Sequence, residues 1–89
     1  MTDGQTMGMG GMKYSLPSRD LIADCIEMMT EAYQCDAAIT LSGCDKTIPA
    51  ALMPLARNDL IGLTLYGGSI RPGKLNGEDL NIVSNFEAV

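Results

Sequence analysis

Three adjacent side chains in the middle of the chain, Cys44, Asp45 and Lys46, carry the groups best suited to metal chemistry. A thiolate is a ligand for iron or zinc, whereas a carboxylate suits magnesium, so the pair could serve two different metals. A structural explanation is also available, with a buried thiol, a turn carboxylate and a solvated ammonium. The tripeptide alone leaves both interpretations open.

The sequence pattern predicts the elements that must position these residues. A helix is expected over residues 19–33, because Ser18 can cap it and apolar residues recur at three- and four-residue spacing along one face: Leu21, Ile22, Cys25, Ile26, Met29 and Ala32. Short apolar runs predict strands at 37–41 and 61–66. A second helix, which Thr47 can cap, is expected between them at 47–58. Pro54 falls inside that helix and can kink it.

The alternation of helix and strand predicts an α/β unit with parallel strands and right-handed crossovers. In such units reactive groups collect at the carboxyl ends of the strands. Cys44-Asp45-Lys46 and Gly67-Gly68 each follow a predicted strand. We therefore expect the two segments to lie side by side at one edge of the sheet.

Composition excludes several classes of protein. The net charge is -5 and the six Lys and Arg residues form no basic stripe, which argues against nucleic-acid binding. No apolar run approaches the roughly 18 residues of a membrane helix. Three cysteines without CxxC spacing argue against a disulfide framework and a self-contained zinc site, and favour a reducing compartment. We expect Cys25 and Cys35 to be structural.

Several ordered motifs cover nearly all of the chain. They are Asp3-Gly4, Met7-Gly8, Gly11-Met12, Tyr14-Ser15-Leu16-Pro17-Ser18-Arg19, Ile22-Ala23-Asp24, Cys44-Asp45-Lys46 with Pro49, and Tyr66-Gly67-Gly68. Together they strongly resemble the family that contains dihydroxy-acid, phosphogluconate and sugar-acid dehydratases. The segment from Asn81 to Ala88 is similar to the dihydroxy-acid branch. Pro49-Ala50 departs from the family pattern, which commonly has glycine after this proline.

The resemblance implies a role for four residues. Cys44 matches a ligand of an iron–sulfur cluster, with [2Fe–2S] favoured over [4Fe–4S]. Asp3 and Asp45 match ligands of Mg²⁺, and Lys46 matches a lysine that becomes N-carboxylated and then binds Mg²⁺. No catalytic base is assigned within the chain, because the family's proton-abstracting serine lies outside this stretch.

The resemblance also implies a fold and an activity. Residues 1–89 are expected to be an internal piece of an N-terminal domain with three α/β/α layers and parallel strands, without the C-terminal domain and inactive alone. The complete enzyme is expected to be a hydro-lyase that converts 2,3-dihydroxy acids to 2-keto acids in isoleucine and valine biosynthesis. We expect it to form a homodimer or larger homo-oligomer. The expected compartment is the cytoplasm in bacteria, and mitochondria or plastids in eukaryotes.

Two alternatives stay open at the level of sequence. The first is a sugar-acid or phosphogluconate dehydratase of the same family, with a polyol substrate. The second belongs to another class, a small acidic α/β interaction module that binds no metal and whose Cys-Asp-Lys turn is structural.

Overall fold

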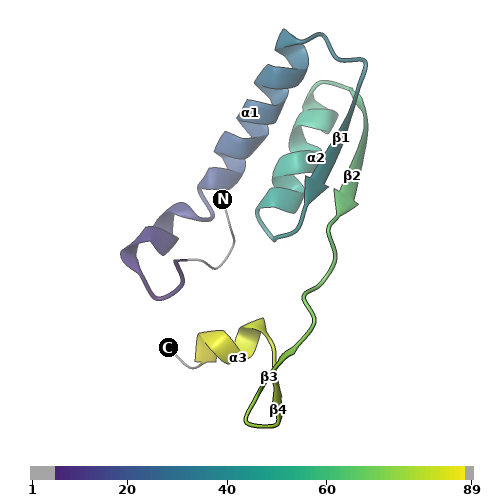
Figure 1. The fold of residues 1–89 in the computed structure, drawn as a ribbon. Coiled ribbons are helices and arrows are strands. Elements are labelled where there is room, and N and C mark those ends of the chain that lie inside the picture. Colours follow the sequence, from purple (N-terminus) through teal and green to yellow (C-terminus); the bar gives the residue numbers. More distant parts are fainter. Residues whose placement is uncertain (1–5, 88–89) are drawn as a thin grey trace.

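The computed structural model describes residues 6–87. A 3₁₀ helix, η1 (Gly10–Tyr14), precedes the unit α1 (Ser18–Ala32), β1 (Ala37–Ser42), α2 (Thr47–Arg57) and β2 (Ile61–Tyr66). A hairpin of β3 (Gly73–Leu75) and β4 (Glu78–Leu80) and a short helix, α3 (Ile82–Glu87), complete the chain (Figure 1). The four central elements match the sequence prediction to within one or two residues. The glycine- and methionine-rich start of the chain predicts a loop over the first dozen residues, but Gly10–Tyr14 form the 3₁₀ helix.

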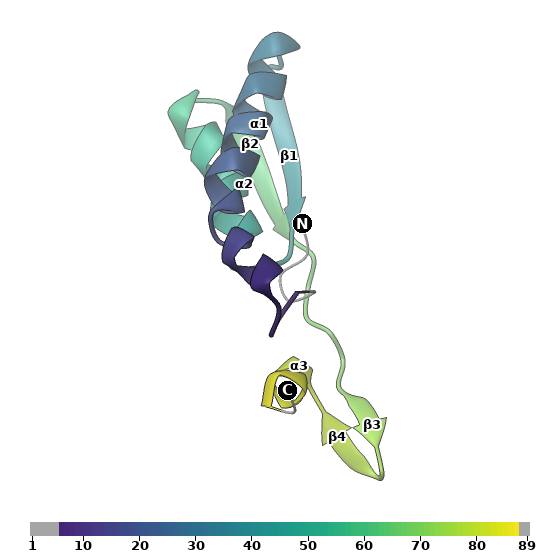
Figure 2. The same ribbon diagram turned by 90° about the vertical axis from the view of Figure 1, so that its left-hand side faces the viewer.

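The two long strands pair in parallel, as predicted. Their register runs from Ala37 opposite Ile61 to Ser42 opposite Tyr66, and α2 makes the crossover between them. Both α1 and α2 lie on the same face of this sheet (Figure 2). The carboxyl ends of β1 and β2 therefore meet at one edge, and the main-chain N–H of Gly67 donates to the Ser42 carbonyl at 2.8 Å. Within residues 6–87 the fold has two of the three expected layers.

The two faces of the sheet have opposite chemistry. Toward the helices the strands present small or hydroxylated residues, and the hydroxyls of Thr40 and Thr64 lie 3.0 Å apart. The outer face is apolar, with five large side chains that are 54–77% exposed: Ile39, Leu41, Ile61, Leu63 and Leu65. Alternation along each strand places all five on one side. The larger apolar surface of this sheet is therefore the one that the described residues leave open.

Small residues let the two long helices approach closely. Ala23 of α1 and Ala50 of α2 are both fully buried. Near the other end of α2, Arg57 contacts the carboxylates of Asp24 and Glu27 at 2.9 and 3.1 Å. The helix continues past Pro54, since the N–H of Asn58 donates to the Pro54 carbonyl at 3.0 Å. Pro54 is itself fully buried, so the ring that was expected to disturb the helix contributes to the core.

The predicted apolar face of α1 is only partly buried. Ile22 and Ile26 are half-buried beside α2, whereas Leu21 is 64% exposed and Met29 is 54% exposed. Cys25, predicted on the same face, is exposed as well. The contact with α2 is centred on Ala23 rather than on the larger side chains. A stripe of apolar residues on α1 thus remains open to solvent.

The hairpin is another element that was not predicted from the sequence. Its two-residue turn is Asn76-Gly77, whose φ angles of 53° and 86° are those that a tight antiparallel hairpin requires. After β4, the Oδ1 of Asn81 accepts hydrogen bonds from the N–H groups of Val83 and Ser84 and caps α3. No helix in residues 6–87 has the length and apolar content needed to cross a membrane.

Gly62 gives a test of the contact between the sheet and α2. A Cβ at this position would lie 2.5 Å from Cδ1 of Leu55, so Gly62→Ala should lower the free energy of unfolding by about 1–3 kcal/mol. Urea unfolding of the protein measures this loss. Adding Leu55→Ala should relieve the clash, so the two losses should not add. Gly73→Ala, where a Cβ meets nothing within 4 Å, is the control and should have little effect.

Candidate functional site

The Cys-Asp-Lys turn joins the carboxyl end of β1 to the first turn of α2. Lys46 occupies the N-cap position with helical backbone angles, and Thr47 is the first residue of the helix. The sequence analysis expected Thr47 to cap this helix. Its hydroxyl instead turns back to the loop, where it accepts hydrogen bonds from the N–H groups of Gly43 and Cys44 at 3.4 and 3.1 Å. Thr47 thereby fixes the conformation of the turn.

The environment of Cys44 favours the thiolate. Burial raises the pKa of this thiol, but hydrogen bonds from the Thr47 hydroxyl and from the backbone N–H groups of Thr47 and Lys46 lower it more. The positive charge of Lys46 acts in the same direction, and the net pKa is below that of an ordinary cysteine. The Cys44 sulfur lies 2.9 Å from the Thr47 hydroxyl. These interactions favour the thiolate, which is the form in which a cysteine binds a metal.

The two neighbours of Cys44 differ sharply in exposure. The carboxylate residue Asp45 is exposed, while Lys46 is fully buried, with 0% of its surface accessible. Asp3, the other predicted magnesium ligand, lies outside the described residues. Within residues 6–87 no three His, Cys, Asp or Glu side chains gather as a metal-binding group. The described part therefore presents one thiolate and one carboxylate, next to a buried lysine.

Buried polar side chains occur at this turn and at the start of α1. In the described residues four polar side chains are buried: Ser15, Ser18, Ser42 and Lys46. The Ser18 hydroxyl donates to the carbonyl of Ser15, but the hydroxyls of Ser15 and Ser42 have no hydrogen-bond partner in this part of the chain. The sequence analysis singled out neither serine as a site residue. For Ser42 a signal existed, because it is the last residue of β1 on the side that faces the helices.

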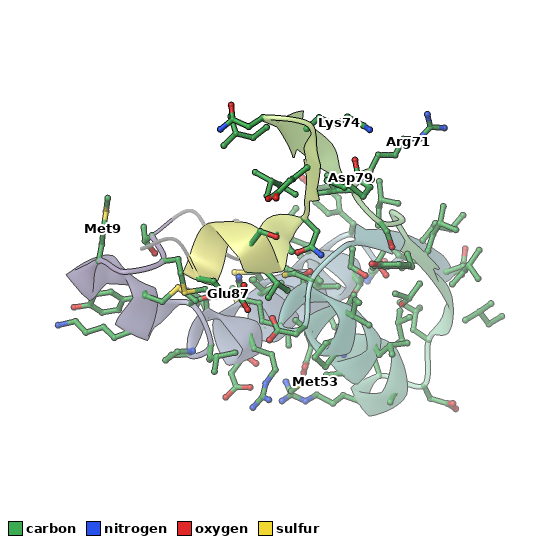
Figure 3. All side chains as sticks on the ribbon, turned by 90° about the horizontal axis from the view of Figure 1, so that it is seen from below. Met9, Met53, Arg71, Lys74, Asp79 and Glu87 are labelled. Carbon is green, nitrogen blue, oxygen red and sulfur yellow. The ribbon has the colours of Figure 1, made fainter. Side chains whose placement is uncertain are left out.

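A cavity of about 620 Å³ opens beside the turn, at the carboxyl edge of the sheet. Gly43, Tyr66 and Gly68 line it from the strand ends, and Asn81 lines it from the start of α3. Gly68 has a φ of 92°, a conformation that favours glycine and lets the backbone turn away from β2. Arg71 and Lys74 also border this cavity, but Figure 3 shows Lys74 directed toward Asp79 and Arg71 pointing outward from the ribbon.

The two remaining cysteines are separate from this turn. Cys25 and Cys35 are both free and exposed, on α1 and on the loop that follows it. Neither joins Cys44 in a metal-binding group within the described residues. Of the predicted site residues, Cys44, Asp45 and Lys46 are therefore brought together.

Comparison with known proteins gives one family over the whole chain. Residues 1–89 match the model of the dihydroxy-acid/6-phosphogluconate dehydratase N-terminal family. A dihydroxy-acid dehydratase from Prochlorococcus marinus is 53% identical over 89 residues, and one from Cupriavidus pinatubonensis is 49% identical over the same length. Dihydroxy-acid dehydratase 2 of Burkholderia lata is 51% identical. Each match covers the entire chain but only 16% of the relative.

The pKa of Cys44 can be tested by alkylation of the metal-free protein. Because the thiol has a lowered pKa, its reaction with iodoacetamide should persist at a pH below that of an ordinary cysteine. Thr47→Val removes the hydroxyl hydrogen bond and should shift the pH midpoint upward. Peptide mass spectrometry measures the rate of alkylation at each cysteine. Thr64→Val, which removes a hydroxyl elsewhere in the sheet, should leave the midpoint unchanged; an equal shift in both variants would contradict this role of Thr47.

Proposed function

This chain belongs to the dihydroxy-acid/6-phosphogluconate dehydratase family, and we propose that it supplies part of the metal site of a complete enzyme that dehydrates 2,3-dihydroxy acids to 2-keto acids. The observation that carries the proposal is the pairing of a cysteine of lowered pKa with a fully buried lysine at the carboxyl edge of the sheet. The chain spans 16% of the length of these relatives. Residues 1–89 would then be part of an N-terminal domain.

We assign Cys44 as one ligand of an iron–sulfur cluster. Its hydrogen bonds to backbone N–H groups and to a hydroxyl are the kind that stabilise a metal-bound thiolate and tune a cluster. One thiolate does not hold a cluster, so the other cysteine ligands must come from the complete protein. The residues present fit a partial ligand set, with [2Fe–2S] favoured over [4Fe–4S].

We assign Asp45 and Asp3 as ligands of Mg²⁺, together with an N-carboxylated Lys46. Lys46 is fully buried at the start of α2, where the positive end of the helix dipole lies. A carbamate is an anion, which the same dipole favours. The neutral amine attacks dissolved carbon dioxide, an N–C bond forms, and one C=O electron pair moves to oxygen. Starting from the ammonium, two protons leave and the charge changes from +1 to -1.

When bound, the iron–sulfur cluster and Mg²⁺ would act as Lewis acids toward the carboxylate, the C2 oxygen and the departing C3 hydroxyl of the substrate. Residues of this chain would hold the ligands of both groups in place. Thr47 fixes the turn that carries Cys44, and Gly68 turns the backbone away from β2 beside the cavity. The cavity of about 620 Å³ has the size of a site for a small organic acid. No residue of this chain is assigned as the base that removes the C2 proton.

The names of the relatives favour the dihydroxy-acid branch over the sugar-acid and phosphogluconate branch. We therefore propose 2,3-dihydroxyisovalerate and related precursors of the branched-chain amino acids as substrates. A homodimer or larger homo-oligomer is proposed for the complete enzyme. A cytoplasmic location in bacteria, or an organellar one in eukaryotes, also stays a prediction.

The function is tested with the complete protein, purified anaerobically with iron, sulfide and Mg²⁺. Keto-acid formation from 2,3-dihydroxyisovalerate should exceed that from 6-phosphogluconate, and Cys44→Ser should lower the iron and sulfide content. A protein that folds and binds neither iron nor sulfide would instead support the interaction-module alternative. Preference for 6-phosphogluconate would indicate that the enzyme belongs to the phosphogluconate branch of the family.

Lys46→Arg tests the role of the lysine in the same complete protein. Arginine keeps a positive charge but does not form the carbamate, so dehydratase activity should fall at least a hundredfold, and carbon dioxide should not restore it. After dissolved carbon dioxide has been removed, the activity of the unmodified enzyme should rise as carbon dioxide is added back. Lys13→Arg, at an exposed lysine on η1, is the matched control and should keep full activity. Full activity of Lys46→Arg would contradict the assignment.

A further inference from the structure

Two buried serines, one before α1 and one at the end of β1, have no explanation in the packing of the described residues. Ser15 is 3% exposed and Ser42 is 7% exposed, and neither hydroxyl has a hydrogen-bond partner in this part of the chain. A buried hydroxyl that lacks a partner is destabilising, so native proteins seldom keep one without a further role. The other inward-facing hydroxyls of the sheet, on Thr40 and Thr64, lie within hydrogen-bonding distance of each other.

Ser15 lies at the same end of the helix pair as Lys46. The two helices α1 and α2 run in the same direction with their N-termini at the same end (Figure 1). Arg57 near the end of α2 contacts Asp24 and Glu27 of α1. Lys46 stands immediately before α2, and Ser15 lies in the turn that precedes α1.

Ser42 reaches the same region from the sheet. It ends β1, and its position alternates with the exposed Ile39 and Leu41, so its side chain faces the helices. Lys46 follows four residues later, fully buried at the start of α2. Ser42 therefore lies four residues before the buried lysine on the helix-facing side of the sheet, and Ser15 precedes α1 at the same end of the helix pair.

We propose that the hydroxyls of Ser42 and Ser15 donate hydrogen bonds to the carbamate of Lys46, and so act as positioning residues for it. The inference rests on the proposed function, which supplies the carbamate. A carbamate has two oxygens with several lone pairs, and a metal ion uses only some of them. Hydroxyl donors would satisfy the remainder, just as neighbouring polar groups orient carboxylates that bind metals. Both orphan hydroxyls would then gain an acceptor in the modified protein.

The test measures the carbamate itself in the complete protein. Enzyme equilibrated with Mg²⁺ at a series of carbon dioxide concentrations is treated with triethyloxonium, which alkylates carbamates, and the Lys46 peptide is quantified by mass spectrometry. A hydrogen bond to a charged group contributes enough to shift an equilibrium by roughly tenfold or more. Ser42→Ala and Ser15→Ala should therefore each raise the half-saturating carbon dioxide concentration about tenfold. Ser42→Thr, which keeps the hydroxyl, should restore most of the occupancy.

Thr40→Val is the matched control, because it removes a hydroxyl from the same strand as Ser42, on the same helix-facing side of the sheet. It should leave the half-saturating concentration within about twofold of the unmodified protein. An equal shift in Thr40→Val and Ser42→Ala would overturn the inference, since general loosening of the sheet would then explain both. Unchanged occupancy in both serine variants would overturn it as well.

Failure of the inference can be told apart from failure of the proposed function. If the unmodified enzyme forms keto acid but no trapped carbamate at any carbon dioxide concentration, the serine role is wrong while the dehydratase activity stands. If it forms neither, the proposed function itself fails. Thermal unfolding of each variant, expected to stay close to that of the unmodified protein, shows that the shifts do not come from unfolding.

Discussion

The burial of Lys46 at the first turn of α2 is the constraint around which this structure is organised. The side chain of Lys46 is withdrawn from solvent at the positive end of the helix dipole. Cys44 lies two residues earlier in the same turn. The charge of Lys46 and the backbone N–H groups at the start of α2 both lower the pKa of Cys44. Cys44 and Lys46 are therefore one electrostatic unit rather than two independent site residues.

Much of the fold was predictable because it depends on local patterns. The apolar runs of β1 and β2 and the spacing in α1 and α2 are visible in the chain, and their alternation predicts parallel pairing. The family motifs pointed to Cys44, Asp45 and Lys46, and the structure places all three at the carboxyl edge. The role of each in metal binding is a proposal that rests on the family.

Other features depend on contacts that a single sequence does not reveal. Which side of α1 meets α2 was misjudged, because the contact is made by Ala23 and not by the larger Leu21 or Met29. The burial of Ser15, which lies in a turn, has no sequence pattern that marks it, whereas Ser42 could have been placed on the inner side of β1 by strand alternation. The hairpin at Asn76-Gly77 is different, since that dipeptide is a known turn signal and was overlooked.

The apolar outer face of the β1–β2 sheet has a consequence for biosynthesis. Five large side chains on adjacent strands form a surface of the kind that associates with other apolar surfaces in water. During synthesis, a sheet that pairs before its outer face is covered exposes these five side chains to the surroundings. Chaperone binding and misassembly would then compete with folding for as long as the face stays open.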